Sequence, residues 1–119
     1  MASSIKSNMT SYKVFYKDYE NNVSIPSSNP DLVNSDRIKF LAESLLQHAD
    51  NFLGIIDRND VILQAYLDDD EQYIFLELIF PESTNFLQTR MNWTDAFNLL
   101  SNLPIEFSRD SLPNAESIK

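Results

Sequence analysis

Three apolar runs lie in the middle of the chain, and two short polar segments separate them. The apolar runs are residues 52–57, 61–67 and 73–80, and the polar segments are residues 58–60 and 68–72. β-Strands favour β-branched and aromatic side chains, and short polar segments between such runs are typical of β-hairpins. The pattern therefore predicts an antiparallel β-sheet around which the rest of the chain is organised.

Side chains alternate between the two faces of a strand, so the second and third runs define two predicted faces. One face is apolar and is expected to pack against helices; it consists of Val61, Leu63, Ala65, Leu67, Ile74, Leu76, Leu78 and Phe80. The other face is mixed and is expected to be at least partly solvated; it consists of Ile62, Gln64, Tyr66, Tyr73, Phe75, Glu77 and Ile79.

The segments that flank the core predict two further strands. Residues 11–19 are rich in aromatic side chains and predict an edge strand, because their lysines would discourage unwanted strand pairing. Residues 20–34 are rich in Asn, Ser and Pro and predict a loop. After the core, residues 85–91 predict a fourth strand.

Two stretches have apolar residues at helical spacing, and each predicts an amphipathic helix. The first helix is expected to begin at Ser35 as its N-cap and to end at residues 48–51. The second is expected to be capped by Asn92 or Thr94 and ended by Pro104. The apolar positions are Ile38, Leu41, Ala42, Leu45, Leu46 and Ala49 in the first helix, and Trp93, Ala96, Phe97, Leu100 and Leu103 in the second.

Together these elements predict an α+β fold in which an antiparallel sheet of three to five strands packs against two main helices. A length of 119 residues fits one domain. We expect residues 11–104 to form this domain, with a flexible N-terminal tail at 1–10 and a C-terminal tail at 105–119. The stretch 112–116 is expected to be too polar to join the core.

Composition argues against several classes of function. The chain has no Cys and one His, which excludes disulfides, thiolate zinc sites, a Cys nucleophile and sites built from several imidazoles. It has one Gly, whereas loops that wrap a phosphate or a dinucleotide need several. We therefore expect no cofactor and no metal. We also expect a cytoplasmic protein, because the N-terminus has no apolar leader and no apolar run approaches about 18 residues.

The formal net charge is −9, and the acidic residues are concentrated near the predicted hairpins. Residues 57–82 hold eight acids and one base, which gives this segment a net charge of −7. Such a field repels nucleic acid and anionic membranes and attracts basic partners. We therefore expect a basic protein partner, no nucleic acid and no membrane. The alternative is that the charge serves solubility alone.

The candidate binding surface combines the polar and aromatic side chains of the mixed face with the acidic loop beside it. Protein interfaces favour aromatic residues surrounded by a polar rim. The alternative is that the N-terminal strand or the second helix covers these side chains, or that they are simply half-exposed. The predicted partner-binding residues are Gln64, Tyr66, Asp68, Asp69, Asp70, Glu71, Tyr73, Phe75 and Glu77.

Other groups suggest chemistry, but each has a simpler explanation. The acidic run 68–71 offers oxygen ligands, yet it lacks the alternating acids, the Gly and the distal Glu of a calcium loop. Glu77 with Asp57 or His48 would supply a general acid or base, although a cross-strand pair with Arg90 or an exposed charge accounts for Glu77 more simply. No Gly-x-Ser-x-Gly motif is present to support a hydrolase. We therefore expect a protein that is not an enzyme.

A wider resemblance involves the runs 52–57, 61–64 and 73–81 and the helix followed by Pro at 93–104. In size, charge and layout, residues 35–104 resemble small bacterial immunity proteins, which neutralise a cognate toxin. The resemblance implies an acidic, non-enzymatic inhibitor that blocks the basic active site of a toxin or a surface beside it. Small acidic α+β chains also resemble type III secretion chaperones, usually dimers that hold an unfolded effector segment in an apolar groove. Neither resemblance assigns a role to an individual residue.

Overall fold

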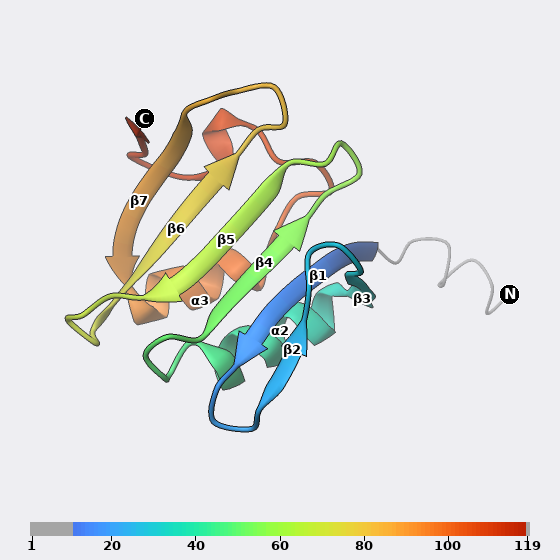
Figure 1. Ribbon diagram of the computed structural model, residues 1–119. Helices are drawn as coiled ribbons and strands as arrows, with labels where there is room; N and C mark the ends of the chain where they lie inside the picture. Colours follow the sequence, from blue (N-terminus) through green and yellow to red (C-terminus); the bar gives the residue numbers. More distant parts are fainter. Residues whose placement is uncertain (1–10, 119) are drawn as a thin grey trace, which may run out of the picture.

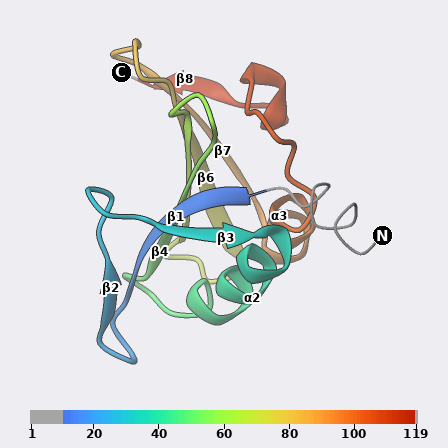
Figure 2. The same cartoon turned by 90° about the vertical axis from the view of Figure 1, so that its right-hand side faces the viewer.

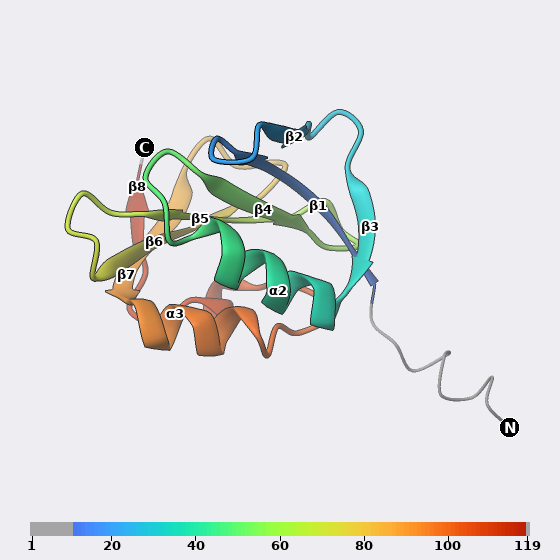
Figure 3. The ribbon, with the colours of Figure 1, turned by 90° about the horizontal axis from the view of Figure 1, so that it is seen from below.

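The structure is a computed structural model that describes residues 11–118. Over these residues the chain forms eight β-strands and two α-helices in two layers (Figure 1). All of these strands belong to one antiparallel sheet, and both helices lie against the same face of it (Figures 2 and 3). The α+β class, the antiparallel sheet and the two helices are confirmed, but the sheet has more strands than the three to five predicted.

The strands follow the chain almost in order across the sheet, because most neighbours are joined by hairpins. The sheet order is β2-β1-β4-β5-β6-β7-β8, and β3 also pairs with β1. In chain order the elements are β1 (Ser11–Asp18), β2 (Val23–Ile25), β3 (Asp31–Asn34), α2 (Ser35–Leu45), β4 (Phe52–Ile56), β5 (Ile62–Leu67), β6 (Tyr73–Ile79), β7 (Phe86–Asn92), α3 (Trp93–Leu100), the 3₁₀ turn η1 (Arg109–Ser111) and β8 (Glu116–Ile118).

β1 lies inside the sheet, so the prediction of an edge strand was wrong. It pairs with β4 on one side and with β2 and β3 on the other. The prediction of a loop at 20–34 was wrong in part, because β2 and β3 are short strands between turns rich in Asn, Ser and Pro. Tyr12, Val14 and Tyr16, at alternate positions of β1, are buried in the core.

Asparagine side chains start both helices. The N-cap of α2 is Asn34, whose Oδ1 accepts a hydrogen bond from the Arg37 N–H at 2.9 Å, so the cap lies one residue earlier than predicted. The N-cap of α3 is Asn92, as predicted, and its Oδ1 accepts from the Asp95 N–H at 2.8 Å. Such caps satisfy backbone donors that have no partner within the helix. Helix α2 ends at Leu45, earlier than predicted.

Asn51 explains where α2 ends and how the helix joins the sheet. Its side chain is almost fully buried, and its Nδ2 donates to the Leu45 carbonyl at 3.1 Å, which occupies an acceptor of the last helical turn. Its Oδ1 accepts from the Tyr19 N–H at 2.8 Å. The hydrogen bond from the Asn21 side chain to Asp18 lowers the pKa of that carboxyl, which adjoins Asn51 at the end of β1.

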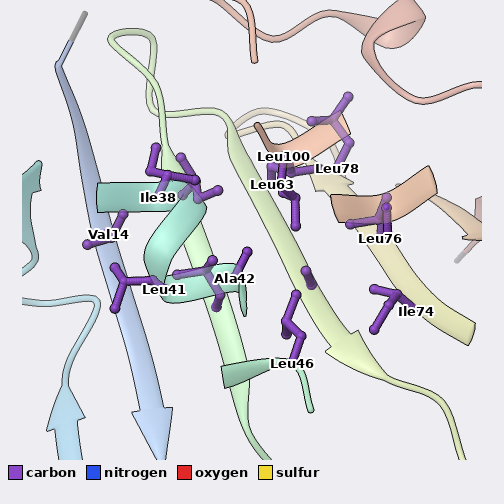
Figure 4. Packing of buried hydrophobic residues seen from close by; sticks show 14 of the residues in the cluster. Val14, Ile38, Leu41, Ala42, Leu46, Leu63, Ile74, Leu76, Leu78 and Leu100 are labelled. Atoms are coloured by element: carbon purple, nitrogen blue, oxygen red, sulfur yellow. The ribbon is translucent and has the colours of Figure 1, made fainter. Parts of the chain in front are cut away.

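The hydrophobic core fills the space between the two helices and the sheet (Figure 4). Each large aliphatic side chain that is fully buried contributes about 1.5–3 kcal/mol relative to an exposed one. The residues that Figure 4 labels show how both layers take part; they are Val14, Ile38, Leu41, Ala42, Leu46, Leu63, Ile74, Leu76, Leu78 and Leu100.

The chain after α3 folds back against the sheet. Leu112 was expected to lie outside the core, and this expectation is wrong because it is only 3% exposed. Phe107 is also buried, and its ring stacks on Tyr12 with 6.2 Å between the ring centres. Four polar residues separate these two side chains, so they produce no periodic pattern. Burial of single anchors therefore fastens this segment to the core.

Two predictions about the ends and the location of the chain are not tested. Residues 1–10, predicted to be a flexible tail, lie outside the described residues. Among residues 11–118, no helix is both long enough and apolar enough to span a membrane. The predicted cytoplasmic location stays a prediction.

Candidate functional site

The candidate site lies on the face of the sheet that is turned away from α2 and α3, here called the open face (Figures 2 and 3). No helix among residues 11–118 covers this face. Residues that lie opposite each other in paired strands are neighbours on the same face. Cross-strand pairing therefore arranges most side chains of the open face in three rows that run across the strands.

Two of these rows are mainly apolar, and their apolar side chains are only partly buried. The first, here called the apolar row, consists of Ile56, Ile62, Ile79, Phe86 and Ile118. The second, here called the aromatic row, consists of Phe52, Tyr66 and Phe75. In the aromatic row, the rings of Tyr66 and Phe75 lie 5.5 Å apart, and Arg90 on β7 lies opposite Phe75.

The third row, here called the polar row, lies between the other two. At its β1 end, Phe15 lies opposite Gly54, and a Cβ atom on residue 54 would overlap the Phe15 ring. The one glycine of the sequence therefore makes room for an aromatic ring on this face. The polar row consists of Gly54, Gln64, Glu77, Gln88 and Glu116.

Glu77 lies at the centre of the polar row and is 9% exposed. Its Oε2 accepts a hydrogen bond from the Tyr66 hydroxyl at 2.6 Å and another from Gln88 Nε2 at 3.0 Å. Burial raises the pKa of Tyr66 to about 12, and the hydrogen bond to Glu77 adds to this rise. The phenol therefore stays a neutral donor to the carboxylate across the physiological range of pH.

The acidic loop, residues 68–72, is fastened to β7 by Arg90. Arg90 Nε lies 2.7 Å from Asp68 Oδ2, and Arg90 Nη2 lies 3.9 Å from Asp70 Oδ2. The guanidinium carbon lies 3.9 Å from the centre of the Tyr73 ring, which belongs to the open face. A guanidinium that meets a carboxylate and an aromatic ring together is held in a defined orientation. The acidic loop is therefore held at the edge of the open face.

A groove of about 480 Å³ lies between the acidic loop and the aromatic row. Its lining includes four carboxylates and three aromatic rings but no Lys or Arg. The side chains of Asp69 and Glu71 make no hydrogen bond or ion pair with the rest of residues 11–118. The groove is thus an acidic and aromatic hollow, and its charged and aromatic residues are Asp50, Asp68, Asp69, Glu71, Phe52, Tyr66 and Phe75.

The structure places all nine predicted binding residues on the open face or in the acidic loop beside it. The suggested pairing of Glu77 with Arg90 was wrong, because Glu77 lies opposite Gln88 and Phe75 lies opposite Arg90. Gln88 and Arg90 alternate along β7 and so lie on one face, but only the strand register shows that they adjoin Glu77 and Tyr73. The role of the nine predicted residues in binding stays a prediction.

Two residues of the groove were missed because no local pattern marks them. Phe52 lies in the first apolar run, whose two faces cannot be told apart when most of its residues are apolar. Asp50 lies in the turn after α2 and has a positive φ of 74°. Both come beside Tyr66 and the acidic loop only through the pairing of β4 with β5.

The groups considered for acid–base chemistry make separate contacts. Asp57 is buried and accepts three backbone N–H groups, one of them from Phe107 at 2.7 Å in the C-terminal segment. His48 Nδ1 lies 3.9 Å from Glu20 Oε2 at the surface. Glu77 makes none of these contacts, because its hydrogen bonds lie on the open face. The structure therefore does not bring the three groups together.

No family model, curated protein or solved structure matches this chain. The resemblance to immunity proteins and to secretion chaperones remains an expectation. Among residues 11–118 there is no group of three or more His, Cys, Asp or Glu side chains placed to hold a metal ion. The open face, with its rows and its groove, is the feature from which a function is inferred.

Proposed function

We propose that this chain is a non-enzymatic binding protein, an immunity-like inhibitor that neutralises a basic protein toxin through the open face of its sheet. The observation that carries the proposal is the pair of partly buried apolar and aromatic rows that no helix of residues 11–118 covers. Apolar side chains gathered on one face and rimmed by polar groups are typical of surfaces that bind proteins. The two rows would form the centre of the interface.

The charge of the groove supports a basic partner. Asp69 and Glu71 have no partner of their own among the described residues, so they are available to Lys or Arg side chains. Negative potential on one partner and positive potential on the other speeds up association and makes it sensitive to salt. A toxin that is active on an anionic substrate would carry such positive potential at its active site.

The acidic loop is ordered by contacts within the protein, which supports a role in recognition. Arg90 connects it to β7 through Asp68 and stacks on Tyr73, so the loop does not depend on a partner for these contacts. A surface that is already in its binding conformation loses less conformational entropy when the complex forms. Fast and tight binding is what an inhibitor of a toxin requires.

A pull-down from the source organism at low and then at high salt tests the proposal, with the size of the bait measured by light scattering. One folded, basic partner that is held by a monomeric bait and released by salt would support it. A dimeric bait that carries an unfolded segment would instead indicate a secretion chaperone. Recovery of no partner would leave the acidic residues with a role in solubility and would count against the inhibitor.

A double variant then tests the groove itself. Asp69→Asn with Glu71→Gln should slow association by about tenfold at low salt. The double variant removes two carboxylate charges of the groove and leaves the ion pairs of Arg90 with Asp68 and Asp70 in place. Glu43→Gln with Glu82→Gln is the matched control, since it removes the same charge from exposed positions elsewhere. Equal rates for the two double variants, measured by surface plasmon resonance, would contradict binding at the groove.

A further inference from the structure

Glu77 is a nearly buried carboxylate on the open face, and it lies between the apolar row and the aromatic row. No Lys, Arg or His among residues 11–118 forms an ion pair with it. We propose that Glu77 anchors a guanidinium group, an Arg side chain of the partner that enters the polar row beside the Tyr66 ring. This inference rests on the proposed function and names the chemical group that the open face recognises.

The cost of removing water from Glu77 calls for a cation. A partner that covers the open face removes the water that still reaches this side chain. A carboxylate that loses its water is strongly unfavourable unless it gains an opposite charge as well as hydrogen bonds. Tyr66 and Gln88 are neutral donors, so they leave the negative charge uncompensated. A cation from the partner would turn a costly group into a favourable contact.

The geometry of the network leaves an acceptor for this cation. Both donors, Tyr66 and Gln88, bind the same oxygen, Glu77 Oε2. No N–H or O–H group of residues 11–118 donates to Oε1, and no polar side-chain atom buried among these residues lacks a partner. Oε1 is therefore the oxygen that remains accessible. Gln64 lies directly opposite Glu77 on β5, and its side-chain carbonyl is a second acceptor for the incoming group.

A guanidinium fits this site better than an ammonium group does. Arg90 already shows the arrangement on the same face, because it stacks on Tyr73 and forms an ion pair with Asp68. Tyr66 presents a second ring directly beside Glu77. The planar guanidinium stacks on a ring and donates in its own plane at the same time, whereas an ammonium group is more strongly hydrated. The neighbouring ring therefore favours Arg over Lys.

A small probe tests the site on the full chain without knowledge of the partner. N-acetyl-arginine methylamide is titrated into ¹³C,¹⁵N-labelled protein, and the carboxyl carbon of Glu77 and the ring of Tyr66 are followed by NMR. Both signals should shift in a saturable manner at millimolar probe. The citrulline analogue, which has the same shape without the charge, should leave them unchanged, and the lysine analogue should bind more weakly. An arginine probe that leaves Glu77 unmoved would overturn the proposal.

A substitution tests the same anchor in the complex. Glu77→Gln keeps an oxygen for Tyr66 and Gln88 and replaces the charged Oε1 with a neutral NH₂ group, so the sheet should stay folded, as a thermal melt would show. It should weaken binding of the isolated partner by about 30-fold or more, as expected for a desolvated charge contact. Glu82→Gln, an exposed acid in a turn, is the control and should change affinity by less than about twofold.

The outcomes separate this inference from the proposed function. If Asp69→Asn with Glu71→Gln slows association while Glu77→Gln weakens binding by less than about threefold, the basic partner stands and the anchor is wrong. If the arginine probe binds at Glu77 but the pull-down recovers no basic protein, the anchor stands and the inhibitor is wrong. If neither experiment gives a positive result, both are wrong.

Discussion

Asp57 and Glu77 are buried carboxylates on opposite sides of the sheet, and they are held in different ways. Asp57 accepts three backbone N–H groups from the β4–β5 turn and from the C-terminal segment. Glu77, on the open face, accepts from two side chains of neighbouring strands. Backbone donors are fixed by the fold, whereas side-chain donors can rotate and exchange partners. Asp57 therefore stabilises the fold, whereas the hydrogen bonds of Glu77 can rearrange when another molecule binds.

Apolar residues of one strand show the same contrast. On β6, Leu76 and Leu78 point to the helices and are completely buried. Ile79 and Phe75 belong to the open face and are only partly buried. Since burial of apolar area is the main favourable term in folding, the covered face determines stability. The open face retains apolar area that can still be buried against a partner.

The largest expected effect comes from a pair of truncations on β6. Leu76→Ala should lower the free energy of unfolding by about 2–5 kcal/mol, because it leaves a cavity among fully buried side chains. Ile79→Ala on the open face should cost only about 1 kcal/mol, because water can fill the space. Urea denaturation followed by circular dichroism measures both. Equal losses would show that the open face is packed as tightly as the core.

The second effect concerns the two carboxylates. Asp57→Ala should lower the free energy of unfolding by about 2–3 kcal/mol, because it leaves buried backbone N–H groups without an acceptor. Glu77→Gln should cost less than about 1 kcal/mol, since Tyr66 and Gln88 keep an oxygen to bind. The exposed Asp110→Ala is the control and should be neutral within about 0.5 kcal/mol in the same urea denaturation. A larger loss for Glu77→Gln than for Asp57→Ala would reverse the contrast.

The smallest effect is on ionisation at high pH. The pKa of Tyr66 is raised to about 12, above the value of about 10 in an unfolded chain. The stability linked to neutral Tyr66 is therefore complete below pH about 10 and is lost as the pH rises toward 12. Glu77→Gln should lower this pKa but leave it above the ordinary value, because burial is the larger cause.

NMR of ¹³Cζ-labelled tyrosines measures this titration. Tyr66→Phe should remove the signal that titrates near pH 12, and Tyr19→Phe, at an exposed position, should leave it in place. A pKa for Tyr66 that returns to about 10 in the Glu77→Gln variant would show that the carboxylate, and not burial, causes the shift.

Strand alternation was the most informative pattern in the sequence. The segments 61–67 and 73–80 gave the correct two faces, since Leu63, Leu76 and Leu78 are buried and Tyr66 and Phe75 are not. A period of two residues survives in any sheet, whatever the partners of the strand. For that reason alternation alone was enough to place the candidate binding residues of these two strands on one face.

Strand number and strand position could not be predicted in the same way. β2, β3 and β8 pair over only three or four residues, which is too short for a pattern to emerge. The status of β1 as an inner strand depends on those short partners. Whether a strand lies at an edge is a property of its neighbours, and these come from distant parts of the chain.

Spacing and composition were enough to predict the class of fold, the two helices, the two faces of the central strands and the concentration of negative charge. These features depend on spacing and composition, which are local. The folded chain was needed to show that Glu77 contacts Tyr66 and Gln88, that Arg90 binds the acidic loop, and that Phe107 and Leu112 join the core. Strand register and long-range packing bring these residues together. Each contact forms only when segments that are distant in the sequence pair their backbone groups and bury their apolar surfaces at the same time.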